Sequence, residues 1–129
     1  RPGNASFVER AKPEAVEKNV CNFFIEHQLT DAKLYKMSNE EILSLLTQIK
    51  GVGQWTVEML LMFTLARPDV FSTGDLGLQK AIIKLYNVEY ANQKELFEKM
   101  NIIANSWSPY RTYACRYLWR ALDAPLIPM

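Results

Sequence analysis

The stretch Leu46–Thr56 holds the residues whose types and spacing are best suited to chemistry. It reads LTQIKGVGQWT, with Gly51-Val52-Gly53 between two segments of helical periodicity. Two glycines let a backbone turn with positive φ and let another molecule approach without a Cβ in the way. The amides of such a hairpin point outward with the first turn of the next helix, a geometry that favours an anion such as phosphate. A tight helix–helix corner has the same pattern, so the glycines alone leave both interpretations open.

Two helices must position this hairpin. Ser38–Glu41 is a capping box that opens the first helix, and Gly51-Val52-Gly53 ends it. A second helix begins almost at once and is closed by Arg67-Pro68. The pattern therefore predicts a helix-hairpin-helix over about residues 39–66.

The rest of the chain also has helical periodicity. Further helices are predicted from Pro13 to about His27, after a Thr30 cap, from an Asp75 cap through Leu85, and over about Asn92–Asn105. Ser108-Pro109 is expected to open the last helix, with the serine at the N-cap and with Tyr113, Tyr117 and Leu118 on its apolar face. Arg1–Phe7 is polar and is expected to form an arm. These elements predict an all-α domain of about six helices with short connections.

The composition excludes several classes of protein. A chain of 129 residues is one domain by length, and its net charge of +1 does not indicate a strongly basic nucleic-acid binder, although it leaves room for a local basic patch. No apolar run reaches the roughly 18 residues that a membrane span needs. Cys21, Cys115 and the single histidine, His27, cannot assemble a Cys/His zinc site or an iron–sulfur cluster. We expect both cysteines to be buried and reduced, in an intracellular protein.

Three blocks, in this order, resemble the helix-hairpin-helix superfamily of DNA glycosylases, specifically its alkylpurine (3-methyladenine DNA glycosylase II-like) branch. IKGVGQWTVEMLLMF, residues 49–63, is similar to the family's hairpin and second helix. RPDVFSTGDLGLQKA, residues 67–81, is similar to the loop and helix that bear its catalytic aspartate. WSPYRTYACRYLW, residues 107–119, is similar to its C-terminal pocket helix. Residues 16–50 match more loosely.

The resemblance implies that Asp75 is catalytic. Family members break the N-glycosidic bond of a damaged base that is flipped out of the duplex, in base excision repair. The departing sugar develops oxocarbenium character, which a fixed carboxylate stabilises, and the same carboxylate can orient or deprotonate the attacking water. A plain helix cap is the simpler interpretation of Asp75, and one carboxylate can serve both purposes.

The resemblance also implies a base pocket. Trp55 and Trp119 match its aromatic positions, where an electron-rich ring faces a cationic alkylated base; ordinary core packing is the competing interpretation. A lysine replaces Trp55 in the bifunctional branches, so tryptophan there implies a monofunctional, hydrolytic enzyme. Met59 falls where some members carry a tyrosine, a departure that concerns the substrate range. Tyr110 lines the pocket or packs beneath it, and Arg111 lies near the active site or braces it.

For DNA, the resemblance implies contacts between the hairpin and the phosphates of one strand. Gly51, Val52 and Gly53 supply backbone amides, and Gln54 and Thr56 lie beside them. In the family a monovalent cation is often held by the hairpin carbonyls, and we expect no cofactor beyond that and no metal on side chains. The expected partner is double-stranded DNA with alkylated bases, bound by a monomer in the cytoplasm or nucleoid of a bacterium or the nucleus of a eukaryote.

The family normally has another group of helices before the matched region, which closes one side of the pocket and fills the gap left by the flipped base. Residues 1–15 are too short and polar for that role. We therefore expect residues 1–129 to form a helical domain or part-domain, the C-terminal part of a glycosylase domain, with the remainder elsewhere in a longer chain, in a companion chain, or lost. The alternative is a non-catalytic helix-hairpin-helix module that grips the DNA backbone, which leaves the match around Asp75 unexplained.

Overall fold

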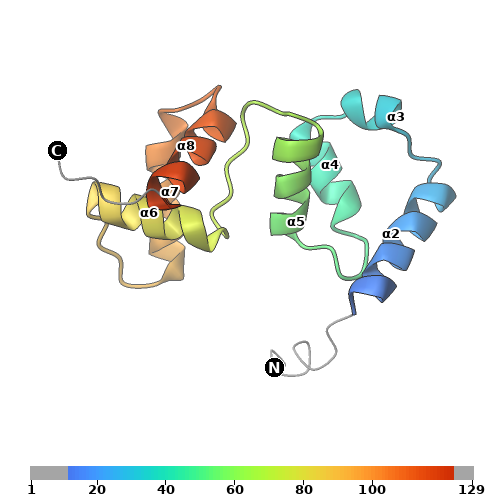
Figure 1. Cartoon of the computed structure of the whole chain (residues 1–129), viewed down its shortest axis with the longest axis horizontal. Helices are drawn as coiled ribbons and strands as arrows, with labels where there is room; N and C mark the ends of the chain where they lie inside the picture. Colours follow the sequence, from blue (N-terminus) through green and yellow to red (C-terminus); the bar gives the residue numbers. More distant parts are fainter. Residues whose placement is uncertain (1–11, 124–129) are drawn as a thin grey trace. The chain divides into compact units, whose positions relative to one another are not determined.

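The computed structural model of the chain describes residues 12–123, and its regular elements there are all helical (Figure 1). Seven α-helices and one π-helix lie in this range. The all-α prediction is therefore confirmed for the described part. The arm predicted for Arg1–Phe7 lies outside the described residues. Within residues 12–123, no helix is both long and apolar enough to cross a membrane.

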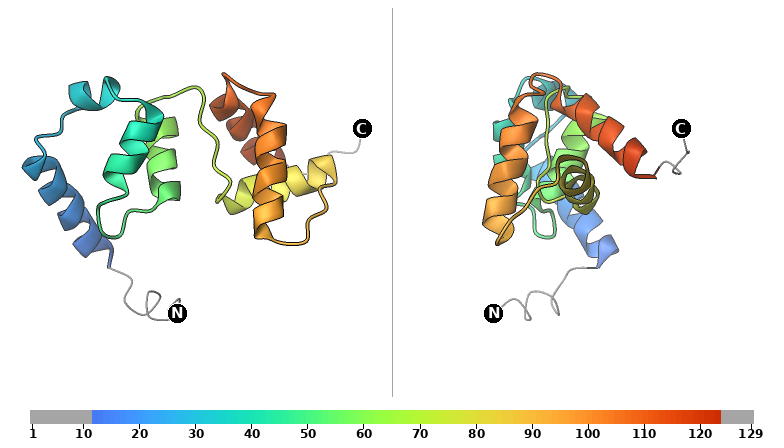
Figure 2. Two further views of the ribbon diagram at one scale, coloured as in Figure 1. Left: turned by 180° about the vertical axis from the view of Figure 1, so that it is seen from behind. Right: turned by 90° about the vertical axis from the view of Figure 1, so that its left-hand side faces the viewer.

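The chain divides into two compact units, Arg1–Val57 and Glu58–Met129, where the sequence predicted one domain or part-domain. The boundary falls inside α5 (Gln54–Met59), and so within the segment predicted as the helix-hairpin-helix. The first unit holds α2 (Pro13–Glu26), α3 (Asp31–Tyr35) and α4 (Asn39–Leu46). The second holds the π-helix η1 (Leu60–Thr64), α6 (Leu76–Tyr86), α7 (Gln93–Asn105) and α8 (Arg111–Asp123), which Figure 2 shows from two further sides.

Local caps set the helix starts in the first unit. The Thr30 hydroxyl accepts the N–H of Lys33 at 3.2 Å and caps α3, as predicted. At α4 the Glu41 N–H donates to Ser38 Oγ at 3.1 Å, and the Ser38 N–H donates to Glu41 Oε1 at 2.8 Å. This reciprocal pair confirms the predicted capping box. The helix is shorter than predicted, because it ends at Leu46 and the buried Ile49 lies in the following turns.

The hairpin packs against α2. Gly51 has φ +94, and a Cβ built on it would lie 2.6 Å from Val16 Cγ2. The amide of Asn19 donates to the carbonyl of Lys50 at 3.1 Å. Gly53 has nothing within 4 Å of its would-be Cβ. The fold itself therefore requires glycine at position 51 and tolerates a side chain at position 53.

The core of the second unit lies where α6 and α8 pack against each other. Its fully buried side chains include Met62, Leu78, Ile82, Met100 and Cys115. Two polar caps fix helix starts here: Asp75 begins α6, as predicted, and Asn92 begins α7. The core therefore takes residues from α6, α7, α8 and η1.

Three predictions are wrong, two about the last block and one about the first. Helix α8 begins at Arg111, because the Ser108 hydroxyl donates to Asp69 Oδ2 at 2.8 Å instead of capping a helix. Its buried face is Thr112, Cys115 and Leu118. Tyr113, one residue after Thr112, and Tyr117, one residue before Leu118, point away from that face and are exposed. The helix after the hairpin is α-helical only to Met59. The Leu65 N–H then bonds the Leu60 carbonyl five residues back at 3.0 Å, which makes a π-helical turn.

The prediction for the cysteines is half right. Cys115 is buried in the second unit, and burial raises the pKa of its thiol to about 12. Cys21 is exposed on α2, next to the half-buried Val20. Both are free thiols.

Candidate active site

Asp75 is a buried carboxylate, 8% exposed, at the start of α6. Its Oδ1 accepts the backbone N–H of Leu78 at 2.9 Å. The same oxygen accepts the indole Nε1–H of Trp119 at 2.8 Å, from α8. Hydrogen bonds to an ionised acceptor are strong, and two donors on one oxygen fix the orientation of the carboxylate. The predicted N-cap is confirmed, and the hydrogen bond to Trp119 is an addition that sequence reasoning missed.

Trp119 is half-buried, so it does not simply fill the core. A Cβ built on Gly77 would lie 3.1 Å from its Cδ1 and 3.2 Å from Asp75 Oδ1. The lack of a side chain at Gly77 therefore lets the indole approach the first turn of α6. The indole ring also lies near Phe63, with ring centroids 5.8 Å apart and planes tilted by 31°.

Phe63 was missed by sequence reasoning. It lies on η1, more than half exposed, and the Arg116 guanidinium lies over its ring at 5.3 Å from the centroid. A π-helical turn rotates the residues after Met59 relative to an α-helix. Because α-helical periodicity was assumed throughout, no sequence signal placed Phe63 beside Trp119.

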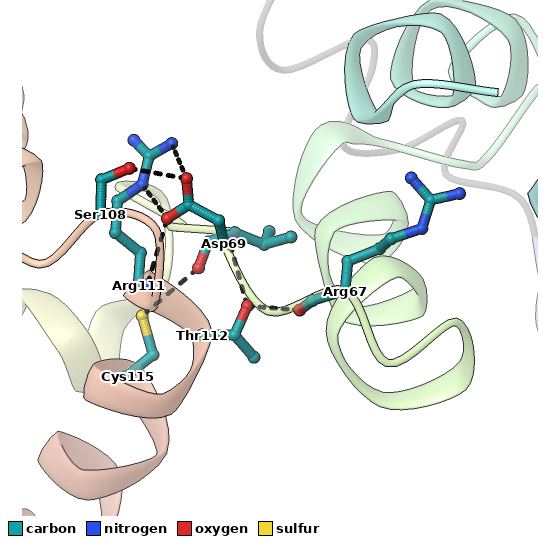
Figure 3. A network of polar contacts seen from close by, with 7 residues as sticks. Arg67, Asp69, Ser108, Arg111, Thr112 and Cys115 are labelled. Atoms are coloured by element: carbon teal, nitrogen blue, oxygen red, sulfur yellow. Dashed lines mark hydrogen bonds and ion pairs between the residues drawn. The ribbon is translucent and has the colours of Figure 1, made fainter.

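The loop that leads to Asp75 is fastened to the start of α8 (Figure 3). Asp69 Oδ1 accepts from Arg111 Nε at 2.7 Å and from the Arg111 backbone N–H at 3.2 Å, and Oδ2 accepts from Arg111 Nη2 at 3.1 Å. Ser108 Oγ donates to Oδ2 at 2.8 Å. The Arg111 guanidinium that donates to Asp69 lowers the pKa of that carboxyl to about 2.

Thr112 holds the neighbouring residues of the same loop. Its hydroxyl donates to the Arg67 carbonyl at 2.7 Å and accepts the Val70 N–H at 2.9 Å. Its own N–H donates to the Pro68 carbonyl at 3.0 Å. One turn later, Cys115 Sγ approaches the Val70 carbonyl at 3.8 Å. Residues 67–70 are therefore tied to α8 through backbone atoms as well as side chains.

A buried polar pair supports the middle of the loop. The Ser72 hydroxyl, which is fully buried, donates to Glu58 Oε1 at 2.6 Å. The Ser72 carbonyl accepts the Asp75 N–H at 3.3 Å. Gln79 Nε2 donates to the Thr73 carbonyl at 2.8 Å. These contacts shape the turn that ends at Asp75, and sequence reasoning assigned none of them.

The predicted site residues divide between the two units. Within the second unit the structure brings Asp75 and Trp119 together. Tyr110, 61% exposed, directly precedes α8, and the helix from Arg111 to Trp119 spans roughly 12 Å, so the structure does not bring Tyr110 to Asp75. Met59 is half-buried at the end of α5, and Trp55, 50% exposed, belongs to the first unit.

The predicted hairpin residues lie at the surface of the first unit. Val52, Gly53 and Gln54 line a groove of about 490 Å³, together with Glu40 and side chains of α4 and the turn after it. Gly51 and Thr56 are exposed. Among residues 12–123, no group of three or more histidine, cysteine, aspartate or glutamate side chains is arranged to hold a metal ion.

Several known proteins are similar to this chain, although no family model matches it. It is 38% identical over 98 residues to the putative DNA-3-methyladenine glycosylase YfjP of Bacillus subtilis, covering 76% of this chain and 33% of that protein. It is 40% identical over 93 residues to DNA-3-methyladenine glycosylase 1 of Schizosaccharomyces pombe, covering 70% and 39%. A crystal structure of a Bacillus halodurans DNA-3-methyladenine glycosidase superposes with a TM-score of 0.73 at 34% identity, covering 95% of this chain and 56% of that one.

The chain is homologous to the DNA-3-methyladenine glycosylases. The resemblance inferred from the three sequence blocks is thereby confirmed, as is the glycosylase-type helical fold. A Schizosaccharomyces pombe 3-methyladenine DNA glycosylase in complex with abasic DNA has the same fold, with a TM-score of 0.64 at 34% identity, covering 78% of this chain and 48% of that one. This glycosylase homologue spans about a third of the length of its first curated relative and about half of each of the two solved structures.

Proposed function

We propose that this protein is a monofunctional DNA glycosylase that hydrolyses the N-glycosidic bond of alkylated purines in base excision repair. The observation that carries the proposal is the buried Asp75 carboxylate, held by the Leu78 amide and the Trp119 indole, in a chain homologous to DNA-3-methyladenine glycosylases. An N-cap needs only the Leu78 amide. The further hydrogen bond from the Trp119 indole therefore favours a role for this carboxylate beyond capping α6.

The chemistry assigned to Asp75 follows from the charge that develops on the sugar. As the glycosidic bond breaks, the sugar becomes oxocarbenium-like, and a pre-oriented carboxylate stabilises it without reorganising. The same group orients or deprotonates the water that attacks the sugar carbon. An alkylated purine is already cationic, so it leaves with its bonding electrons as a neutral base and needs little acid assistance.

Aromatic rings suit this substrate. Trp119 lies beside Asp75 and next to Phe63, and a desolvated cationic base over such a ring gains roughly 1–2 kcal/mol. We place Trp119 in the base pocket, and Trp55, Met59 and Tyr110 are candidates for it from the resemblance alone. Tryptophan at position 55, where bifunctional relatives of the superfamily carry lysine, supports a hydrolytic enzyme without lyase activity.

DNA binding is assigned to the hairpin. Gly53, Gln54 and Thr56 are exposed, Gly53 and Gln54 line an open groove, and a homologue was solved with abasic DNA. Backbone contacts of this kind need no large basic charge, in keeping with a net charge of +1. A monovalent cation on the hairpin carbonyls is part of the proposal, although the Ile49 and Lys50 carbonyls already accept the Val52 N–H and the Asn19 amide. The partner is double-stranded DNA with alkylated bases. The location is the cytoplasm or nucleoid of a bacterium or the nucleus of a eukaryote.

Base release from an oligonucleotide duplex with one methylated purine tests the proposal. We expect free methylated base and an abasic strand, which alkali then cleaves. The matched control is the same duplex without the lesion. Binding of both duplexes with no release by any length of the protein would favour the alternative, a backbone-binding helix-hairpin-helix module.

A further inference from the structure

The loop that carries Asp75 contacts α8 near both of the loop's ends. Contacts at residues 67–70 are made by Arg111, Thr112 and Cys115, and the contact at Asp75 is made by Trp119. Arg111, Cys115 and Trp119 are four residues apart and therefore share a face, and Thr112 lies next to it, three residues before Cys115. Both ends of the loop are thus bound to the same helix.

The length of the loop alone does not determine the position of Asp75 along α8. The six residues from Asp69 to Asp75 could span roughly 20 Å if extended, whereas the helix between their anchors spans roughly 12 Å. The turn at residues 72–75 shortens the loop to the distance between the two anchors. The position of Asp75 relative to Trp119 therefore depends on where the first anchor holds the chain.

That first anchor combines the contacts of Thr112 with the backbone of residues 67, 68 and 70 and the side-chain contact between Asp69 and Arg111. Asp69 accepts four hydrogen bonds, two of them from the planar guanidinium of Arg111, and only about a quarter of each side chain is exposed. A two-point guanidinium–carboxylate contact fixes direction as well as distance, which a lysine cannot reproduce. Because the Arg111 guanidinium lies directly beside it, Asp69 stays ionised throughout the neutral range.

We propose that Asp69 and Arg111 are positioning residues that set the register of the loop on α8, so that the Asp75 carboxylate meets the Trp119 indole N–H. The proposal rests on the proposed function in that Asp75 is the catalytic carboxylate. Neither Asp69 nor Arg111 touches substrate in this role. Both act through the loop, from the end of α8 opposite to Trp119.

The first readout is the indole N–H resonance of Trp119, which needs no enzymatic activity. The chain has three tryptophans, so three indole signals are expected, and Trp119→Phe identifies the one that disappears. Asp75→Asn gives the shift produced by a weakened acceptor. We expect Asp69→Asn and Arg111→Met to move the Trp119 signal. Arg111→Lys keeps the charge but loses the two-point contact, and should move the signal less. An unmoved signal in all three folded variants overturns the proposal.

A matched control separates this effect from the general loss of an ion pair. Glu95→Gln breaks the exposed Lys99–Glu95 pair on α7, in the same unit, and should leave the Trp119 signal in place. If Arg111→Met does not fold, Arg111→Lys and Asp69→Asn carry the test.

The second readout is single-turnover base release, measured with DNA affinity in a form of the protein that is active. A displaced catalytic group lowers the chemical rate by roughly 10-fold to 100-fold, while the affinity for DNA stays unchanged. A moved Trp119 signal together with an unchanged rate in an active parent overturns the positioning role. If the parent itself releases no base, the proposed function fails, whereas a moved signal still supports the link between Arg111 and the Asp75–Trp119 contact.

Discussion

The indole N–H of Trp119 donates to Oδ1 of Asp75 at 2.8 Å, across 44 positions of sequence. The same oxygen caps α6 through the Leu78 N–H. The carboxylate is thereby tied both to the helix that it begins and to the neighbouring helix α8. A group that must face a developing positive charge benefits from this arrangement, because its orientation is set before substrate arrives.

Trp119→Phe tests that contact, because it keeps an aromatic ring and removes the N–H donor. We expect base release to fall roughly 10-fold or more, since Asp75 loses a donor that orients it. The free energy of unfolding should fall by about 1–2 kcal/mol. Single-turnover kinetics and urea unfolding measure the two effects.

Trp107→Phe is the matched control, because Trp107 makes an edge-on contact with Phe71 in the same unit, with centroids 5.9 Å apart. It should leave the rate unchanged. Equal rates for Trp119→Phe and Trp107→Phe would mean that the indole N–H has no part in catalysis.

The two hairpin glycines should respond differently to substitution. Gly51→Ala places a Cβ against Val16 at positive φ, so we expect it to cost about 1–3 kcal/mol of folding free energy. Gly53→Leu adds its side chain in open space and should fold, yet weaken binding to any DNA duplex because it blocks the approach of the backbone. Thermal unfolding and DNA binding at fixed salt measure the two effects. Undiminished DNA affinity in folded Gly53→Leu would remove the hairpin from the interface.

Borohydride distinguishes hydrolysis from lyase chemistry. With tryptophan at position 55, we expect no covalent enzyme–DNA adduct and a product strand that stays intact until alkali is added. A lysine-dependent glycosylase, run in parallel, is the positive control. An adduct with this protein would mean that an amine such as that of Lys50 acts as nucleophile.

The Asp69–Arg111 pair should make stability depend on pH in the acid range. The pKa of Asp69 is lowered from 3.8 to about 2 in the folded state, so folding favours its ionised form. Its stabilising contribution is therefore fully present above about pH 5 and is lost as the pH falls towards 2. We expect Asp69→Asn to cost about 1–2 kcal/mol at neutral pH, after allowance for solvent screening, and less at pH 3. Urea unfolding of both proteins at the two pH values measures this, and a cost that does not shrink in acid would contradict it.

Local patterns in the sequence predicted much of the fold. The Ser38–Glu41 capping box, the Thr30 cap and the Asp75 cap were all correct, because each depends on residues within one helical turn. The family resemblance rested on blocks that include Gly51 and the loop to Asp75, and the homologues confirm it.

Contacts between distant residues could not be predicted. The Trp119–Asp75 and Arg111–Asp69 bonds join residues 44 and 42 positions apart, and no local pattern signals them. Ser108 looked like a helix cap because serine followed by proline is a common helix start, yet its hydroxyl is taken by Asp69. A local rule was overridden there by a tertiary contact.

Asp75→Asn is the measurement that bears most directly on the proposed mechanism. Asparagine keeps the size and capping ability of aspartate and removes its charge, so folding and DNA binding should persist. Asn92→Asp, the reverse change at the N-cap of α7, is the matched control. We predict that single-turnover release of a methylated purine falls roughly 100-fold or more in Asp75→Asn and is unchanged in Asn92→Asp. Release by folded Asp75→Asn at the parent rate would contradict the account and leave Asp75 as a helix cap alone.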